Sequence, residues 1–281
     1  MRKAVQIIWT IITNGYVPGF IKGTIYRGAT KKFCVPGLNC YSCPGALGSC
    51  PIGSLQAVIG SIKYSISYYV LGFLFLIGTI GGRFVCGWLC PFGLIQELLY
   101  KFPSKKRVLY DKLKYIKYGV LIIFVILMPM LFTNKLGMGN PAFCKYICPA
   151  GTLEGGIPLL ITNPALRKSI GLLFTLKFSI LIITLVSSII YFRPFCKVLC
   201  PLGAIYSLFN SISFYRLEVD SNECISCGLC SKACKMNVVP CKNPNALECI
   251  RCNDCMDICP TDAITCNMNI PNKKKGVFNN E

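Results

Sequence analysis

Eight cysteines near the C-terminus fall in two runs whose spacing is that of iron–sulfur ligands. In each run, three cysteines stand at two-residue intervals and a fourth follows after three more residues. This spacing lets one tight loop hold three corners of a cubane cluster, while the fourth thiolate reaches the neighbouring cluster. The runs are Cys224-x2-Cys227-x2-Cys230-x3-Cys234 and Cys249-x2-Cys252-x2-Cys255-x3-Cys259-Pro260.

The spacing predicts two [4Fe–4S] clusters with crossed ligand sets. The expected sets are Cys224, Cys227, Cys230 and Cys259 for the first cluster and Cys249, Cys252, Cys255 and Cys234 for the second. Cys234 is followed by Lys235 instead of proline, and Cys241 lies nearby as a substitute ligand. We retain Cys234 because its spacing is correct, and we interpret Cys241 and Cys266 as packed thiols. Zinc and disulfides are the alternatives, but zinc sites rarely use this triple spacing.

A second cysteine pattern, CxxxCP followed by glycine, is repeated upstream. Its copies are Cys86-Gly-Trp-Leu-Cys90-Pro-Phe-Gly93, Cys196-Lys-Val-Leu-Cys200-Pro-Leu-Gly203 and Cys144-Lys-Tyr-Ile-Cys148-Pro-Ala-Gly151. In CxxxC the two thiols can lie one helical turn apart on one face. The proline then begins the next helix, where its missing N–H costs nothing.

Four long segments with almost no charge surround these motifs. They are 4–21, 64–82, 118–134 and 169–192, the last containing only Lys177. A helix that spans a bilayer needs about 20 mostly apolar residues. The first segment is the weakest candidate, because Asn14, Gly15, Pro18 and Gly19 interrupt it, and its alternative is an interfacial helix.

The basic residues between these segments predict the orientation. With the N-terminus inside, twenty of the Lys and Arg residues fall on the inner side and nine on the outer side. The short segment 83–117 is the most basic, and such loops face the cytoplasm. We therefore expect both termini in the cytoplasm, at the cytoplasmic membrane.

This topology divides the upstream cysteines into two groups. Cys86, Cys90, Cys196 and Cys200 fall at the inner boundary, and their number matches the ligand count of one further cluster. Close helix packing by small residues is the alternative for them. The outer group is Cys34, Cys40, Cys43, Cys50, Cys144 and Cys148. Within it, Cys40, Cys43, Cys50, Cys144 and Cys148 are candidate cofactor ligands, with disulfides as an equal alternative because that compartment can be oxidising.

These features predict an α-helical membrane protein with about four transmembrane helices and a C-terminal α+β ferredoxin-like domain carrying two [4Fe–4S] clusters. The expected domains are 1–213 in the membrane, 214–270 for the ferredoxin-like domain and 271–281 as a basic tail. Short strands are expected at Arg216–Val219 and Ala263–Cys266.

The composition excludes several other functions. The chain has 281 residues, 53% of them hydrophobic, and it has no histidine. Haem held by an axial histidine and a Ser-His-Asp triad are therefore excluded. The net charge of +19 is spread along the segments between apolar runs. We interpret it as membrane orientation charge, and no nucleic-acid partner is expected.

Paired CxxxCP motifs followed by a double CxxCxxCxxxC module resemble the NapH/NosR-type membrane ferredoxins. CGWLCPFG at 86–93 is the most specific match, and the resemblance extends over nearly the whole chain. It implies four spans, cytoplasmic clusters, and electron flow between membrane quinol and a partner redox protein. The third CxxxCP and the cysteine-rich first loop depart from the family pattern.

We expect a membrane-bound electron-transfer protein, with a lipid membrane and a redox protein as partners and quinone as the candidate donor. We expect a non-catalytic subunit of an oxidoreductase system, since no convergent carboxylates or phosphate loop are present. The alternative is a maturation factor that reduces a metal or thiol for a respiratory oxidase or reductase.

Overall fold

The computed structural model describes residues 1–60, 68–132, 139–168 and 170–268, so the expected basic tail lies outside the described residues. The chain forms two compact units. The first unit contains Met1–Phe73 and Leu89–Ala204, and the second contains Leu74–Trp88 together with the chain from Ile205 onward. The second unit therefore combines the predicted ferredoxin-like domain with the segment Leu74–Trp88, which includes the first cysteine of the first CxxxCP motif.

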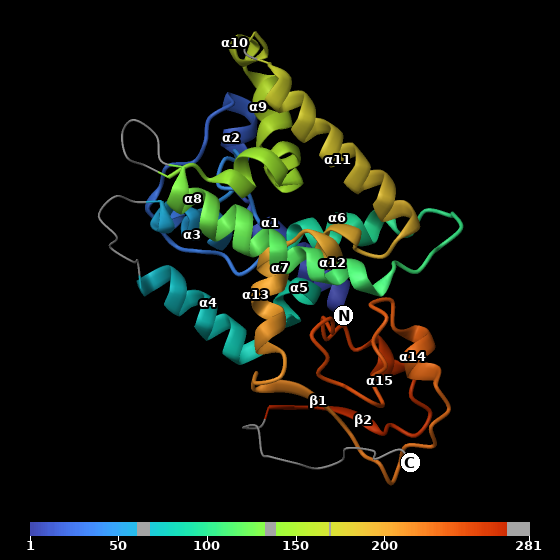
Figure 1. The fold of residues 1–281 in the computed structure, drawn as a ribbon. Coiled ribbons are helices and arrows are strands. Elements are labelled where there is room, and N and C mark those ends of the chain that lie inside the picture. Colours follow the sequence, from blue (N-terminus) through green and yellow to red (C-terminus); the bar gives the residue numbers. More distant parts are fainter. Residues whose placement is uncertain (61–67, 133–138, 169, 269–281) are drawn as a thin grey trace. The chain divides into compact units, whose positions relative to one another are not determined.

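Helices account for most of the described residues (Figure 1). From the N-terminus to the first CxxxCP motif they are α1 (Arg2–Thr13), α2 (Val17–Lys22), η1 (Ala29–Lys32), α3 (Pro51–Ile59), α4 (Tyr68–Gly81), α5 (Phe84–Trp88) and α6 (Pro91–Leu99). The middle of the chain forms η2 (Asp111–Tyr115), α7 (Ile116–Val120), η3 (Leu121–Leu127), α8 (Met128–Leu131), η4 (Phe143–Ile147), η5 (Gly151–Gly156), α9 (Ile157–Thr162) and α10 (Pro164–Arg167). The remaining helices are α11 (Leu172–Ile190), α12 (Pro194–Val198), α13 (Pro201–Phe209), α14 (Leu229–Ala233) and α15 (Asp254–Asp257).

Two helical segments are long and apolar enough to cross a membrane. One is the continuous segment Asp111–Leu131, which runs through η2, α7, η3 and α8, and the other is α11. Both correspond to predicted spans, and large apolar side chains on them are exposed, such as Ile123 and Ile183. The second predicted span, 64–82, is described only as the shorter apolar helix α4, because residues 61–67 lie outside the described residues.

The first predicted span is not a single helix. It is divided into α1 and α2 by Asn14-Gly15-Tyr16, where residues that favour turns interrupt the apolar sequence. The two ends of this segment nevertheless contact different parts of the first unit. Arg2 forms an ion pair of 2.7 Å with Glu97 on α6, whereas the Gly23 carbonyl accepts a 2.9 Å hydrogen bond from Asn163 after α9. Together, the two helices connect the surroundings of two different CxxxCP motifs.

α1 presents its apolar side outward. Gln6 and Thr13 are buried against the protein, whereas Ile8, Ile11 and Ile12 are more than half exposed. Gln6 donates a 2.9 Å hydrogen bond to the Cys90 carbonyl. Buried polar and exposed apolar side chains are the arrangement expected of a helix at a lipid boundary.

The second unit contains a two-stranded antiparallel sheet made of β1 (Tyr215–Val219) and β2 (Ile264–Met268), both visible in Figure 1. Leu217 pairs with Cys266 and Val219 with Ile264. The strands lie within one or two residues of the predicted positions. Their inner side packs on a small core in which Leu217 and Ile264 meet Cys230 and Cys255. Cys266 is exposed on β2, so its interpretation as a packed thiol is wrong. Residue alternation places it on the same side of the sheet as Ile264, but the small core that buries Leu217 and Ile264 does not extend to it.

Candidate metal centres

The two ferredoxin-like loops share an unusual backbone conformation. Ser226 and Gly228 in the first loop have φ of 52° and 73°, and Arg251 and Asn253 in the second have φ of 51° and 67°. Left-handed residues on either side of one cysteine curl the chain around a concave surface lined with backbone N–H groups, which favours bound anions. Each loop then enters a short helix, α14 or α15, that carries the third cysteine.

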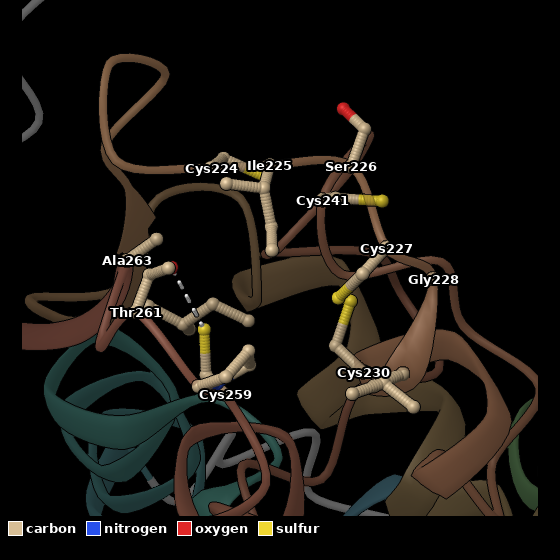
Figure 2. A pocket seen from close by; sticks show the side chains of 13 residues that line it. Cys224, Ile225, Ser226, Cys227, Gly228, Cys230, Cys241, Cys259, Thr261 and Ala263 are labelled. Atoms are coloured by element: carbon tan, nitrogen blue, oxygen red, sulfur yellow. Dashed lines mark hydrogen bonds between the residues drawn. The ribbon is translucent and has the colours of Figure 1, made fainter.

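The four predicted ligands of the first cluster line one pocket (Figure 2). They are Cys224, Cys227, Cys230 and Cys259. Burial opposes ionisation of Cys259, but the N–H groups of Thr261, Ala263 and Ile264 and the Thr261 hydroxyl together lower the pKa of its thiol. Figure 2 shows the Thr261 hydroxyl directed at Cys259 Sγ, 3.8 Å away. These donors fit a ligand that must bind as a thiolate.

Cys241 lines the same pocket, beside Cys230. The sequence offered Cys241 as a substitute for Cys234, which belongs to the other predicted ligand set. The structure places it instead against the first set and in contact with the small core between the strands and loops. Cys241 is therefore positioned as a neighbour of the first site and not as a replacement for Cys234.

The predicted ligands of the second cluster also lie near one another. Burial, followed by the proximity of Cys249, Cys252 and Cys234, raises the pKa of the Cys255 thiol to about 12. Burial likewise raises the pKa of Cys249, with Cys234 as a further contributor. Thiols with raised pKa values are costly to ionise alone, and a bound metal offsets that cost by deprotonating them. The residues present thus fit a [4Fe–4S] cluster in each of the two sets.

Two buried arginines hold the second loop against the helices of the same unit. Arg251 donates to the carbonyls of Gly81 and Asn210, each at 2.8 Å. Arg83 pairs with Glu248 at 2.6 Å and also donates to the Leu247 carbonyl. Charged hydrogen bonds of this kind are stronger than neutral ones. Removal of either partner is costly, because the other is then left buried without a partner.

Cys86 lies on α5, close to the loop of the second cluster. The next residue, Gly87, lies so near the Ile250 carbonyl that no Cβ could be added without a shift. Trp88 donates from its indole N–H to the Arg251 carbonyl at 2.9 Å. The first CxxxCP motif therefore begins in direct contact with the chain between Cys249 and Cys252.

The other cysteines of the two inner motifs lie in the first unit. Cys90 and Cys200 immediately precede α6 and α13, each of which begins with proline as predicted. The N–H groups of Gly93 and Gly203 both lie 3.4 Å from the preceding cysteine Sγ. Each motif thus directs a helix N-terminus at its second sulfur. The structure assigns Cys86 to the second unit and Cys90, Cys196 and Cys200 to the first.

A glutamine on the helix after one motif binds the first cysteine of another, and this contact was not predicted. Gln96 Nε2 donates to Cys196 Sγ at 3.2 Å, and Gln96 Oε1 accepts from the Phe195 N–H at 3.2 Å. Gln56 makes the same two contacts with Cys144 Sγ, at 3.2 Å, and the Phe143 N–H, at 3.0 Å. We call this two-point contact the glutamine clasp. The matching signal in the sequence is a glutamine six residues after the cysteine of a Cys-Pro pair, at 50–56 and at 90–96.

The six outer cysteines do not all lie in equivalent surroundings. Cys34 Sγ donates to the Ser54 hydroxyl at 3.7 Å, and Cys43 Sγ donates to Asn14 Oδ1 at 3.5 Å. The others, Cys40, Cys50, Cys144 and Cys148, gather elsewhere in the first unit. All twenty cysteines are in the described part of the chain, and no disulfide joins any of them there. Within that part, no three cysteine or carboxylate side chains form a group that could hold a single metal ion.

Comparison with known proteins connects these motifs to iron–sulfur families. Residues 66–109, 118–158 and 173–215 match a family described as 4Fe-4S binding domain, and each stretch contains one CxxxCP motif. Residues 217–239 and 244–265 match a second family with the same description, and they contain the two ferredoxin-like runs.

Individual relatives agree with these matches. The chain is 32% identical to the uncharacterized protein MJ0750 of Methanocaldococcus jannaschii, over 67% of this chain and 74% of that protein. It is 25% identical to the methylamine utilization ferredoxin-type protein MauN of Methylorubrum extorquens, and 27% identical to the regulatory protein NosR of Pseudomonas aeruginosa. The chain belongs to the NapH/NosR-type polyferredoxins. This polyferredoxin is an iron–sulfur electron-transfer protein.

The polyferredoxin shares only part of its length with several relatives. The alignment with MauN covers 66% of this chain and 55% of MauN, and the alignment with NosR covers 55% of this chain and 20% of NosR. No solved structure matches the polyferredoxin.

Proposed function

We propose that this polyferredoxin is a multi-pass membrane protein that passes electrons from a membrane donor, with quinol as the leading candidate, to a partner redox protein. When bound, the two [4Fe–4S] clusters of the second unit supply one-electron redox chemistry. The chain's own residues hold those clusters, tune them and connect them to the membrane motifs. The contact of Gly87 with Ile250 is the observation that carries this proposal.

That contact supports a path between the membrane motifs and the second cluster site. Cys86 adjoins Gly87, and Ile250 lies between the predicted ligands Cys249 and Cys252. Buried hydrogen bonds from Arg251 and Trp88 hold the two segments together. Because these hydrogen bonds fix the two segments, electrons could pass between redox groups held by their cysteines without a movement of the backbone.

The first cluster site suits contact with a partner. Cys227 is exposed, and the exposed apolar residues Ile225 and Leu229 stand beside it in the same loop. An exposed ligand with apolar neighbours is a suitable docking point for a redox protein, whose contacts are typically small and transient. We therefore place the exchange with the partner at this loop.

The membrane arrangement of the proposal follows the predicted four spans, with both termini in the cytoplasm. The segments Asp111–Leu131 and α11 support two of the crossings by length and composition. The paired helices α1 and α2 support the first, because their ends contact Glu97 and Asn163 respectively. The basic segment 83–117 supports the cytoplasmic side for the ferredoxin-like domain.

Direct reduction by a quinol tests this proposal. The full chain is purified anaerobically in detergent, oxidised, and mixed with a menaquinol analogue, while cluster absorbance and EPR signals are followed. We expect the clusters to become reduced, and we expect Gly87→Leu to slow the reduction because the added side chain separates α5 from Ile250. Unreduced clusters, together with retained reduction of copper or a disulfide, would instead favour the maturation factor.

A further inference from the structure

Four of the six outer cysteines meet in one place within the first unit. At Gly151, the position that a Cβ would take lies 3.7 Å from Cys40 Sγ and 3.9 Å from Cys148 Sγ. At Gly53, the equivalent position lies 3.9 Å from Cys144 Sγ and 3.9 Å from the Cys50 Cβ. The two glycines therefore stand between thiols that come from distant parts of the chain.

The third CxxxCP motif joins the two pairs. Cys144 lies in η4, and Cys148 directly follows that helix, with its N–H donating to the Phe143 carbonyl at 2.9 Å. Two cysteines four residues apart lie about one helical turn apart on the same face. The Cys40–Cys148 pair and the Cys50–Cys144 pair therefore form a single group of four thiols.

The surroundings of this group repeat those of the inner motifs. Gln56 forms the glutamine clasp on Cys144 as Gln96 does on Cys196. Cys50 precedes α3, which begins with proline, as Cys90 precedes α6. The N–H groups of Gly53, Ile52 and Asn39 are directed at Cys50 Sγ. N–H···S contacts of this kind are the outer-shell interactions that tune iron–sulfur sites.

Buried polar atoms without partners lie next to the group. Asn39, which precedes Cys40, is fully buried, and neither of its amide atoms has a hydrogen-bond partner among the described residues. Thr152 Oγ1, which follows Gly151, and Glu154 Oε1 are buried and unpartnered in the same sense. Buried polar groups in native structures usually have a hydrogen-bond partner, so these atoms call for one outside the protein chain, such as an ordered water or a bound group.

A positive charge from α11 also reaches this place. Lys177 is the single charged residue between Leu172 and Ile190, and its Nζ lies 3.9 Å from the Cβ position at Gly151. A charged residue within an apolar span is expensive and marks a functional site with a nearby partner. Four thiolates around a [4Fe–4S] cluster carry net negative charge, so a cluster at this place would give the lysine a partner of opposite charge.

We propose that Cys40, Cys50, Cys144 and Cys148 bind a further [4Fe–4S] cluster in the first unit, with Lys177 as the residue that offsets its charge. This goes beyond the two clusters of the ferredoxin-like domain and does not depend on the donor or partner of the proposed function. Cys34 and Cys43 are not in this ligand set, because their thiols donate hydrogen bonds to Ser54 and Asn14, whereas Cys144 Sγ accepts one from Gln56.

Iron counting on matched variants tests the ligand set. The full chain and the variants Cys148→Ser and Cys43→Ser are purified anaerobically, and iron and acid-labile sulfide are measured per chain. We expect Cys148→Ser to lose about 4 iron and 4 sulfide, whereas Cys43→Ser keeps the wild-type content. Equal content in all three proteins, zinc in place of iron, or a disulfide mapped between these cysteines in the wild type would overturn the proposal.

A second variant keeps the test decisive if Cys148→Ser fails to fold. Lys177→Gln retains every thiol, so its iron content should equal that of the wild type. In an EPR-monitored redox titration, one component should shift to lower potential, because loss of a nearby positive charge disfavours the more negative reduced state. The signals of the C-terminal clusters should stay unchanged. A titration in which no component shifts would overturn the proposal.

Discussion

Individual residues set the chemistry of each thiol in this polyferredoxin. Cys259 has backbone and hydroxyl donors that lower its pKa, whereas Cys255 is buried among other thiols that raise it. A cluster whose thiolates accept hydrogen bonds from N–H groups has a higher reduction potential than one whose thiolates lack such donors. The two C-terminal sites therefore differ in electrostatics although their sequence spacing is the same.

The ligand assignment is testable by single substitutions. Cys224→Ala and Cys252→Ala should each remove one cluster, with a loss of about 4 iron per chain, since each deletes one corner of a different cubane. Cys241→Ala should retain both clusters, because Cys241 is a neighbour of the first site and not a predicted ligand. EPR of the reduced protein and iron counting check this result. Loss of a cluster in Cys241→Ala alone would contradict the assignment.

Loss of a glutamine clasp should lower the free energy of unfolding. Gln96→Leu leaves the buried Phe195 N–H without an acceptor, which should lower the free energy of unfolding by about 1–3 kcal/mol. Thermal unfolding in detergent, followed by tryptophan fluorescence, measures the change. The matched control is Leu98→Ala, a substitution at an exposed position on the same helix. Equal losses in both variants would show that the clasp makes no special contribution.

At the scale of elements, short helices and loops position the cysteines, and arginines join those elements. Arg251 belongs to the second cysteine run, yet its guanidinium bonds to Gly81 at the end of α4 and to Asn210 after α13. Arg83, which immediately precedes α5, similarly forms an ion pair with Glu248. The second cluster loop is thus built into the helices of its unit, whereas the first loop has an exposed face.

Removal of the Arg251 side chain should loosen this arrangement. Arg251→Met leaves two buried carbonyls without their donor, at a cost of about 2–4 kcal/mol. Hydrogen exchange of the segment 245–255 should become faster, while the first cluster loop remains as in the wild type. Arg216→Met is the matched control, because its guanidinium bonds at the surface to the Ser211 carbonyl. Unchanged exchange in Arg251→Met would contradict the anchoring role.

The sequence predicted local features well and long-range contacts poorly. Fixed cysteine spacing predicted the two ferredoxin-like loops, and the strands were found within one or two residues of their predicted positions, because both depend on neighbouring residues. The division of the first apolar segment at Asn14 followed from turn-forming residues that were already visible. The contact between Arg251 and Gly81 joins residues 170 apart, and the glutamine clasps join residues 88 and 100 apart. No pattern among neighbouring residues in the sequence could predict contacts between residues so far apart.

For the whole molecule, the two groups of CxxxCP cysteines and the apolar helices predict an electron-transfer protein that spans the membrane. A reporter fused after Glu281 should be active only in the cytoplasm, because the basic segment 83–117 and the ferredoxin-like domain are expected on the same side. A phosphatase that is active only after export serves as the opposite control. Export of the C-terminal reporter would reverse the proposed orientation.

The metal content of the intact chain most directly tests whether this polyferredoxin carries iron–sulfur clusters. Anaerobically purified protein is analysed for iron, zinc and acid-labile sulfide, and its dithionite-reduced form is examined by EPR. We expect at least about 8 iron and 8 sulfide per chain, and signals of reduced [4Fe–4S] clusters that interact magnetically. Protein that contains zinc, or that folds without iron and gives no such signal, would contradict an electron-transfer role.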